Sequence, residues 1–374
     1  MERIAKSKKV YPFLLRISII LILLNFTLSV PAQSLFGRLD EWMETNTKEM
    51  GGRAILVIFK DGHIIYDKSV SDLNHRQKSL IKYVAKKQGQ EADLEEYTLH
   101  SRQLVASSSK WLSAALVMTF VDEGKLRLTD TVGRWLPILS KHGKGNITIS
   151  ECLSQLTGIQ APPLKESLKG MAKINNMDQA VEEIANMPME GKPGKVFHYS
   201  NVGLQIAGAV LEKISGQTFQ ELFATRIAKP LGLKNTDFGN RPVALPAGSA
   251  SSTPEDYLVF LTMILHKGNF NGIQILSDES ITEMEIDRIG PEVKIAYSPA
   301  EAEGLGYGFG EWVVKNTEDG KPVKWVTSPG LFGSFPWVDN ERHYCAFLMT
   351  FYLNNKGRNK RYLGLKQMVD ESVE

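Results

Sequence analysis

One lysine stands at the head of an apolar helical segment, in the stretch LVASSSKWLSAALVM. From Trp111 to Val121 the only residues that are not hydrophobic are Ser113 and Thr119, so this helix should be buried nearly all round. An ammonium group without a partner is costly to bury. Lys110 must therefore be paired, have a lowered pKa, or serve in chemistry.

The serine three residues earlier gives that lysine a chemical role. Ser107 and Lys110 share a helical face, and helical side chains lean toward the N-terminus, which points the amine at Ser107. A desolvated amine can take the serine proton, and free N–H groups of the first helical turn can stabilise an oxyanion. The spacing alone is weak, because Ser79 and Lys82 repeat it in a polar segment that we interpret as surface, and serines also cap helices. The apolar helix behind Lys110 favours a nucleophile at Ser107.

A second polar group lies in PGKVFHYSNVGLQIAGAVLEKISG. A helix is predicted to begin at Val202, with Asn201 or the serine before it as the cap. Tyr199 at such a helix entry can reach a cleft, and its phenol can share a proton with Ser107 and Lys110 if a neighbouring ammonium lowers its pKa. The alternative is that Tyr199 is an amphipathic core residue and Asn201 a plain cap.

The elements that would position these groups come from both ends of the chain. Residues 54–60 and 63–67 form a predicted hairpin around an Asp-Gly turn, and β-branched and aromatic runs follow Gly304. A hairpin alone does not make a stable sheet, so the C-terminal runs are its natural partners. We expect an α/β (α+β) fold with an antiparallel sheet domain from residues 33–105 and 305–374, flanked by helices. A mainly helical domain, residues 106–304, is inserted between them, with the active site at the interface. Helices are predicted at 34–50, 108–123, 149–157, 178–187, 202–215, 218–227, 254–267, 277–286 and 361–372, and strands at 307–314, 324–327, 334–338 and 344–351.

The N-terminus has the layout of a secretory signal peptide. Residues 1–16 carry five basic residues against one acid, residues 17–30 are apolar, and small residues follow. We expect a cut after Ala32 and a periplasmic or secreted location. The alternative is an uncleaved anchor helix, the only membrane contact expected. Removing residues 1–32 lowers the formal net charge from +2 to −2, so no nucleic-acid partner is expected.

The cysteines and histidines limit which disulfides and metal sites the chain can form. Cys152 and Cys345 are the only cysteines, too few for a disulfide framework, and two separate buried thiols are the default, although the sequence leaves their pairing open. The seven histidines show no metal-ligand spacing, so we expect no metal and no cofactor. The expected partner is a small-molecule or peptide substrate, and the oligomeric state stays open.

Several stretches together resemble one family. VASSSKWLSAALVMTFVDEGKLRLTDTVGRWLP is similar to the nucleophile helix of the class C β-lactamase and D,D-peptidase superfamily, which includes serine esterases and amidases. PGKVFHYSN resembles its Tyr-x-Asn element, and the resemblance runs with gaps from about Leu35 to the C-terminal strands. It implies a β-lactamase/penicillin-binding-protein fold in which Ser107 is acylated, Lys110 and Tyr199 transfer protons, and Asn201 is a polar contact.

The third element of that family departs from its usual pattern. It is normally Lys-Thr-Gly or His-x-Gly, and here it reads Ser328-Pro329-Gly330. Loss of the cation weakens recognition of a substrate carboxylate, which argues against β-lactams and D-Ala-D-Ala peptides as best substrates. Gly330 and the N–H of Leu331 can still complete the oxyanion hole. Gln155 stands where relatives often carry histidine.

The stretch LFGSFPWVD resembles the esterase-like branch of the family. Its aromatics, Phe332, Phe335 and Trp337, line an apolar substrate pocket or form sheet core, and alternation alone does not decide which. The expected function is an exported serine hydrolase that cleaves an ester or amide bond through a Ser107 acyl-enzyme. The alternative is a catalytically weak or inactive scaffold that binds peptidoglycan fragments or peptides.

Overall fold

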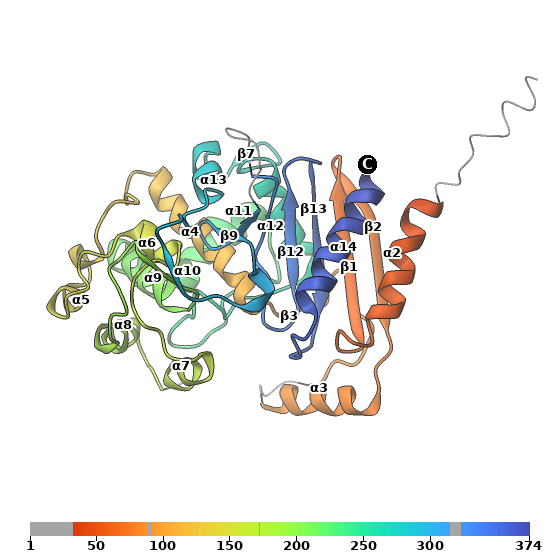
Figure 1. The fold of residues 1–374 in the computed structure, drawn as a ribbon, viewed down its shortest axis with the longest axis horizontal. Helices are drawn as coiled ribbons and strands as arrows, with labels where there is room; N and C mark the ends of the chain where they lie inside the picture. Colours follow the sequence, from red (N-terminus) through yellow and green to blue (C-terminus); the bar gives the residue numbers. More distant parts are fainter. Residues whose placement is uncertain (1–32, 88–90, 172, 315–322) are drawn as a thin grey trace, which may run out of the picture.

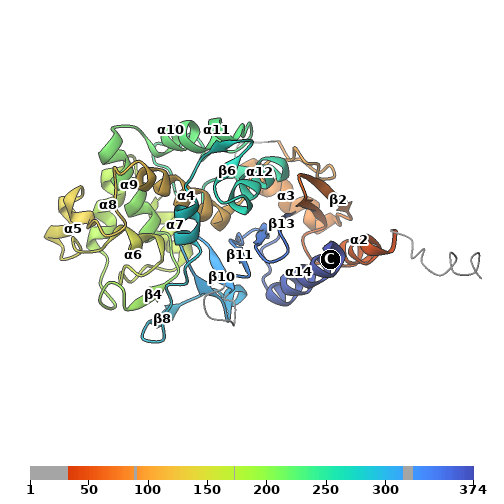
Figure 2. The same cartoon turned by 90° about the horizontal axis from the view of Figure 1, so that it is seen from above.

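A seven-stranded antiparallel sheet built from both ends of the chain is the centre of the fold. The computed structural model describes residues 33–87, 91–171, 173–314 and 323–374, so the predicted signal peptide lies outside the described residues. The strand order is β2-β1-β13-β12-β11-β10-β9, and β1 pairs with β13 from Ala54 opposite Thr350 to Lys60 opposite Tyr344. Figures 1 and 2 show the red and blue ends of the chain side by side. The strands are β1 (Arg53–Lys60), β2 (His63–Ser71), β9 (Gly306–Tyr307), β10 (Trp312–Val314), β11 (Trp325–Thr327), β12 (Phe335–Asp339) and β13 (Tyr344–Thr350).

Two terminal helices cover the outer face of this sheet. They are α2 (Gln33–Asn46) and α14 (Arg358–Val373), which lie side by side in Figure 1. Phe335 and Trp337 are buried beneath them, and the ring of Phe335 stacks on that of Tyr362 with centroids 4.2 Å apart. The alternation of aromatics on β12 therefore belongs to the sheet core and not to a substrate pocket.

The inner face packs against α12 (Pro254–Leu265), which in turn contacts α4 (Ser109–Asp122). Tyr257 stacks on Phe347 of β13, and Trp111 meets Phe260 edge to face, which joins sheet, α12 and α4 into one core. Every residue of α4 from Ser109 to Phe120 is buried, as the apolar pattern predicts.

The helical region lies beyond α4, and α3 (His75–Lys87) extends below the sheet (Figure 1). Cys152 and Cys345 are buried and free, which confirms two separate thiols. No helix among the described residues is long and apolar enough to span a membrane. The remaining helices are α5 (Pro137–Lys141), α6 (Ile149–Leu153), α7 (Leu164–Met171), α8 (Met177–Asn186), α9 (Val202–Ser215), α10 (Phe219–Phe223), α11 (Lys229–Leu231) and α13 (Asp278–Met284).

Some elements differ from the sequence-based expectation. The predicted helix 149–157 ends at Leu153, because Gln155 adopts a positive φ of 63° that stops a right-handed helix. The predicted helix 218–227 changes to a π-helical turn at Ala224–Ala228. A two-stranded parallel pair, β4 (Val196–His198) with β8 (Lys294–Tyr297), was not expected and borders the site described next. The other short pairs are β3 (Gln103–Leu104) with β5 (Ser251–Ser252) and β6 (Asn269–Phe270) with β7 (Ile273–Gln274).

Candidate active site

A short 3-10 turn at Ala106–Ser108 presents Ser107 to a cavity at the start of α4. Ala106 has a φ of 48°, which a side chain other than glycine rarely adopts, so the turn is strained and must be held by its surroundings. The buried Ser108 supplies that support. Its hydroxyl donates to the Ser328 carbonyl at 2.7 Å, and its own carbonyl accepts from the Tyr257 hydroxyl at 2.8 Å.

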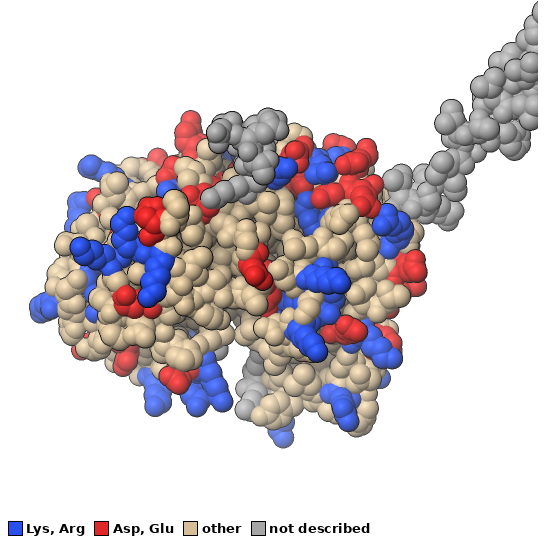
Figure 3. Space-filling view, viewed as in Figure 1, with Lys and Arg blue, Asp and Glu red and all other residues tan. Residues whose placement is uncertain are grey.

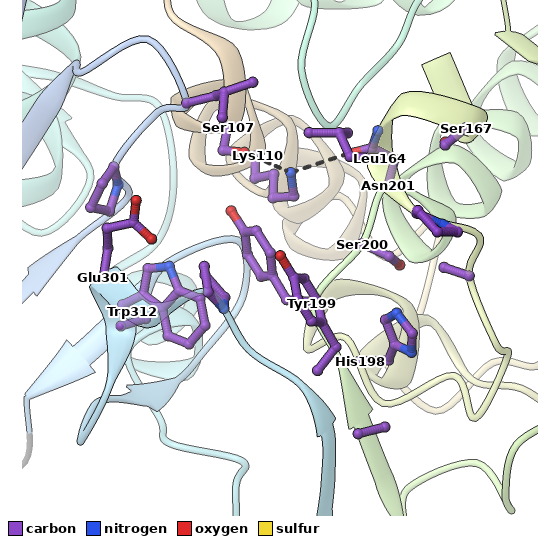
Figure 4. Close-up of a pocket in the computed structure, with 18 of the residues that line it drawn as sticks. Ser107, Lys110, Leu164, Ser167, His198, Tyr199, Ser200, Asn201, Glu301 and Trp312 are labelled. Carbon is purple, nitrogen blue, oxygen red and sulfur yellow. Dashed lines mark hydrogen bonds between the residues drawn. The ribbon is translucent and has the colours of Figure 1, made fainter. Parts of the chain in front are cut away.

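Lys110 lies beside this serine and is almost completely buried. Its Nζ is 3.2 Å from Ser107 Oγ, 2.8 Å from the Ala247 carbonyl oxygen and 3.4 Å from Asn201 Oδ1 (Figure 4). The side chain is 1% exposed, and burial lowers the pKa of the amine to about 7. A large fraction of Lys110 is therefore neutral at physiological pH.

The three partners of the amine decide what its lone pair can do. The Ala247 carbonyl and Asn201 Oδ1 are acceptors, so a neutral Lys110 amine donates its two N–H groups to them. The lone pair then remains for the hydroxyl proton of Ser107. Asn201 is not a side-chain cap of α9, in contrast to one of the two sequence interpretations, because its amide points to the lysine.

Tyr199 follows β4 and lies across the cavity from α4. Its ring centroid is 4.8 Å from Lys110 Nζ, and its ring packs on that of Trp312 with the two centroids 5.1 Å apart. Figure 4 shows the phenol below the Ser107–Lys110 pair. Burial raises the pKa of Tyr199 well above its usual value. The condition that a neighbouring ammonium lowers this pKa is not met, because the amine is itself desolvated and burial of the phenol dominates, so the phenol stays protonated.

Ser328 does not face the cavity. Its side chain is buried, and its hydroxyl donates to the Gly310 carbonyl at 2.9 Å and lies 3.4 Å from the Ser107 carbonyl oxygen. The residue at the position of the family's cation therefore braces the backbone behind Ser107, and it is not among the residues that line the cavity.

Gly330 and Leu331, which follow in the same segment, do line the cavity. A Cβ on Gly330 would lie 2.2 Å from the Val105 carbonyl oxygen, so only glycine permits this close approach. The Gly330 N–H is already bonded to the Ser334 carbonyl at 2.8 Å. Among the described residues the Leu331 N–H has no acceptor, so of these two N–H groups the one of Leu331 is free to stabilise an oxyanion.

Gln155 supports the site from behind and does not line the cavity. Its Oε1 accepts the Ser200 N–H at 3.0 Å, and its carbonyl accepts the His198 N–H at 3.0 Å. These bonds hold the two residues on either side of Tyr199. Gln155 therefore positions the tyrosine segment.

The cavity has a volume of about 600 Å³ and brings together Ser107, Lys110, Tyr199 and Asn201. Most of its wall is apolar, and two side chains that contact carboxylates interrupt it. His198 Nδ1 lies 2.6 Å from a carboxylate oxygen of Glu190, and Arg358 lies 3.4 Å from Glu301. In the described residues no group of three His, Cys, Asp or Glu side chains could hold a metal ion. Figure 3 shows lysine and arginine side chains in small scattered groups on the visible face.

Sequence reasoning missed Trp312 and both contacts with carboxylates. Trp312 lies in the predicted strand 307–314, and no local spacing marks it as a wall of the site. Arg358 and Glu301 are far apart in the sequence and meet only through the fold. For the contact of His198 with Glu190, the only available signal in the sequence was the position of His198 directly before Tyr199.

Comparisons with known proteins show similarity in sequence and in fold. Protein Rv1367c of Mycobacterium tuberculosis is 25% identical over 288 residues, which cover 62% of this chain and 71% of that protein. The crystal structure of a "putative beta-lactamase from Bacteroides dorei" superposes with a TM-score of 0.74 at 25% identity, over 90% of this chain and 98% of the other. EstCE1, described as a hydrolase with promiscuous acyltransferase activity, shares the fold with a TM-score of 0.70 at 19% identity, over 91% of this chain and 100% of the other.

The predicted fold and family are thus confirmed. The family model Beta-lactamase matches residues 41–366, which include Ser107, Lys110 and Tyr199 as well as the third element. Since this match covers most of the chain, the protein belongs to the beta-lactamase family of hydrolases.

Proposed function

We propose that this protein is an exported serine hydrolase that cleaves an ester or amide bond through an acyl-enzyme on Ser107. The observation that carries the proposal is the buried Lys110 amine, which keeps a lone pair for the Ser107 proton 3.2 Å away. An activated nucleophile needs a base within hydrogen-bonding reach with a pKa near the working pH, and Lys110 meets both conditions.

The reaction follows from the positions of these groups. Ser107 Oγ attacks the substrate carbonyl carbon while Lys110 takes the hydroxyl proton. The Leu331 N–H stabilises the oxyanion that forms. Tyr199 gives its phenolic proton to the leaving oxygen or nitrogen as that bond breaks, and Lys110 then returns a proton to the phenolate. Water next attacks the acyl-enzyme, its proton passes to Lys110, and Ser107 recovers a proton as the acid leaves.

The competing function is a scaffold that binds peptides or peptidoglycan fragments without turnover. Two departures from the family pattern favour this scaffold: Ser328 stands in place of the usual cation, and Gln155 stands where relatives often carry histidine. A scaffold, however, has no use for an amine without a carboxylate partner inside an apolar helix, since such a group costs stability. Lys110 therefore favours catalysis.

Export is proposed from the sequence of residues 1–32 alone, with its basic start, apolar run and small residues. Secretion into the periplasm or medium would leave a mature protein that begins at Gln33. The mass of the protein recovered from the native host's periplasm or medium tests the cut, and a chain that retains residues 1–32 in the membrane would support the anchor instead.

The activated serine is tested with a fluorophosphonate probe and intact mass. A single adduct should form on the wild-type protein and on Ser79→Ala, a control at the exposed repeat of the same Ser-x-x-Lys spacing, and should be lost in Ser107→Ala. No adduct on folded wild-type protein would reject the proposal and make the binding scaffold the better interpretation.

A further inference from the structure

The mouth of the cavity is apolar. Of the large apolar side chains that the structure leaves exposed, Leu164, Tyr297 and Leu331 all line this one cavity, with exposed fractions of 46%, 52% and 38%. They come from the start of α7, the end of β8 and the turn after β11. Single exposed apolar residues need no explanation, but three from separate elements around one opening are typical of a ligand-binding rim.

The apolar surface continues inward toward the nucleophile. Pro162, Pro163 and Ala161 line the cavity next to Leu164, and Trp312 lies deeper, against Tyr199. The volume of about 600 Å³ is within the range of about 300–1,000 Å³ that encloses a drug-sized ligand. A substrate with a short acyl group would leave most of this surface in contact with water.

Apart from Lys110 beside Ser107, the described residues that line the cavity offer no free cation for a charged substrate. The guanidinium of Arg358 donates to the carbonyls of Leu331 and Tyr352 at 3.0 Å each and lies 3.4 Å from the Glu301 carboxylate. Its positive charge is therefore balanced within the protein. His198, at another part of the wall, is likewise paired with a carboxylate.

From these features we infer that the substrate is an uncharged ester with a medium-length aliphatic acyl chain. The chain extends from Ser107 along the apolar wall and leaves the cavity between Leu164 and Tyr297. This inference rests on the proposed function, because it assigns the acyl part of the substrate that Ser107 would attack. It excludes chains that end in a carboxylate, since no cation is free to pair with them.

The test compares how fast Ser107 reacts with alkylphosphonate probes. Three p-nitrophenyl phosphonates carry an ethyl chain, an octyl chain, or a chain of octyl length that ends in a carboxylate. Loss of p-nitrophenol gives a phosphonate adduct on Ser107, and intact mass gives the second-order rate constant. Each buried methylene can raise the rate constant up to about fourfold, so the octyl probe should react at least tenfold faster than the ethyl probe. The carboxylated probe should lose most of that advantage.

Matched variants show whether the rim is responsible. Leu164→Asn and Tyr297→Asn should each lower the octyl rate far more than the ethyl rate and so remove much of the octyl advantage. Ile273→Asn, which changes an equally exposed apolar residue of β7 outside the cavity, should behave as the wild type. Labelling of Ser107 without a chain-length preference, or rim variants that slow both probes equally, would overturn the inference while the proposed function stands. Failure of all probes to label Ser107 would overturn both.

Discussion

The Nζ of Lys110 lies 3.2 Å from the Oγ of Ser107, and burial alone brings the pKa of the amine from 10.5 to about 7. The amine can accept the serine proton only when it is neutral, so the rate constant for labelling Ser107 should rise with pH through about 7 and level above it. Below the midpoint it should fall about tenfold per pH unit. The measurement is a fluorophosphonate labelling rate from pH 5 to 10. A midpoint near 10 would show that the amine is not desolvated.

The same lysine should destabilise the fold at low pH. Because its pKa is lower in the folded chain than in the unfolded chain, the unfolded chain binds the extra proton between pH 7 and 10.5. The free energy of unfolding of the wild type should therefore rise across this window, by up to about 1.4 kcal/mol per pH unit. Lys110→Met removes this dependence, so its stability advantage should be largest at pH 7 and below and shrink toward pH 10.

Urea unfolding at pH 6, 8 and 10 measures that difference. Lys82→Met, at an exposed position of α3, is the matched control and should show no pH-dependent gain. A Lys110→Met protein that is less stable than the wild type by the same amount at every pH would indicate that loss of the bond to the Ala247 carbonyl dominates.

Tyr199→Phe should slow hydrolysis without moving the pH midpoint. The phenol stays protonated because burial raises its pKa, so it acts as a proton donor to the leaving group and not as the base. Loss of a general acid costs about 10² in rate, whereas the ring still packs on Trp312 and keeps the fold. Rates on an ester with a poor leaving group should fall more than rates on p-nitrophenyl esters. A midpoint that shifts in Tyr199→Phe would assign the base role to the tyrosine.

The nucleophile, its lysine and its tyrosine were predicted because each rests on local sequence. Three-residue spacing on a helix fixes the Ser107–Lys110 contact, and the apolar run around Lys110 already shows that the amine is desolvated. The sheet was predicted from strand patterns at both chain ends, which need only one another as partners.

The remaining features depend on contacts between distant segments. The inward turn of the Ser328 hydroxyl depends on the carbonyl of Gly310, and the raised pKa of Tyr199 depends on rings from β9 and β10 that pack over it. The parallel pairing of β4 with β8 joins two short segments far apart in the chain. No sequence periodicity indicates such long-range contacts, which is why the walls of the cavity were missed, whereas Ser107, Lys110 and Tyr199, which the structure brings together in one cavity, were predicted.

Ser328→Ala should cost stability and leave chemistry nearly intact. The hydroxyl is buried and donates to the Gly310 carbonyl, so its loss should lower the free energy of unfolding by about 1–3 kcal/mol. Labelling of Ser107 should change by less than about threefold, because the side chain does not line the cavity. Ser79→Ala, on the exposed face of α3, should be neutral in both measurements. A large loss of labelling with unchanged stability would place Ser328 in contact with the substrate after all.

Glu301→Gln should change which chains the cavity accepts. The carboxylate of Glu301 lies 3.4 Å from Arg358, and the amide that replaces it keeps the shape but removes the charge. The guanidinium then keeps its two carbonyl partners, and its positive charge, which a carboxylate no longer balances, can attract an anionic ligand. The ratio of labelling rates for the carboxylated and octyl phosphonates should rise about tenfold, and Glu303→Gln, an exposed neighbour outside the cavity, should leave it unchanged. An unchanged ratio in Glu301→Gln would mean that the two carbonyls alone keep Arg358 from the substrate, and the exclusion of anionic chains would then depend on the apolar rim.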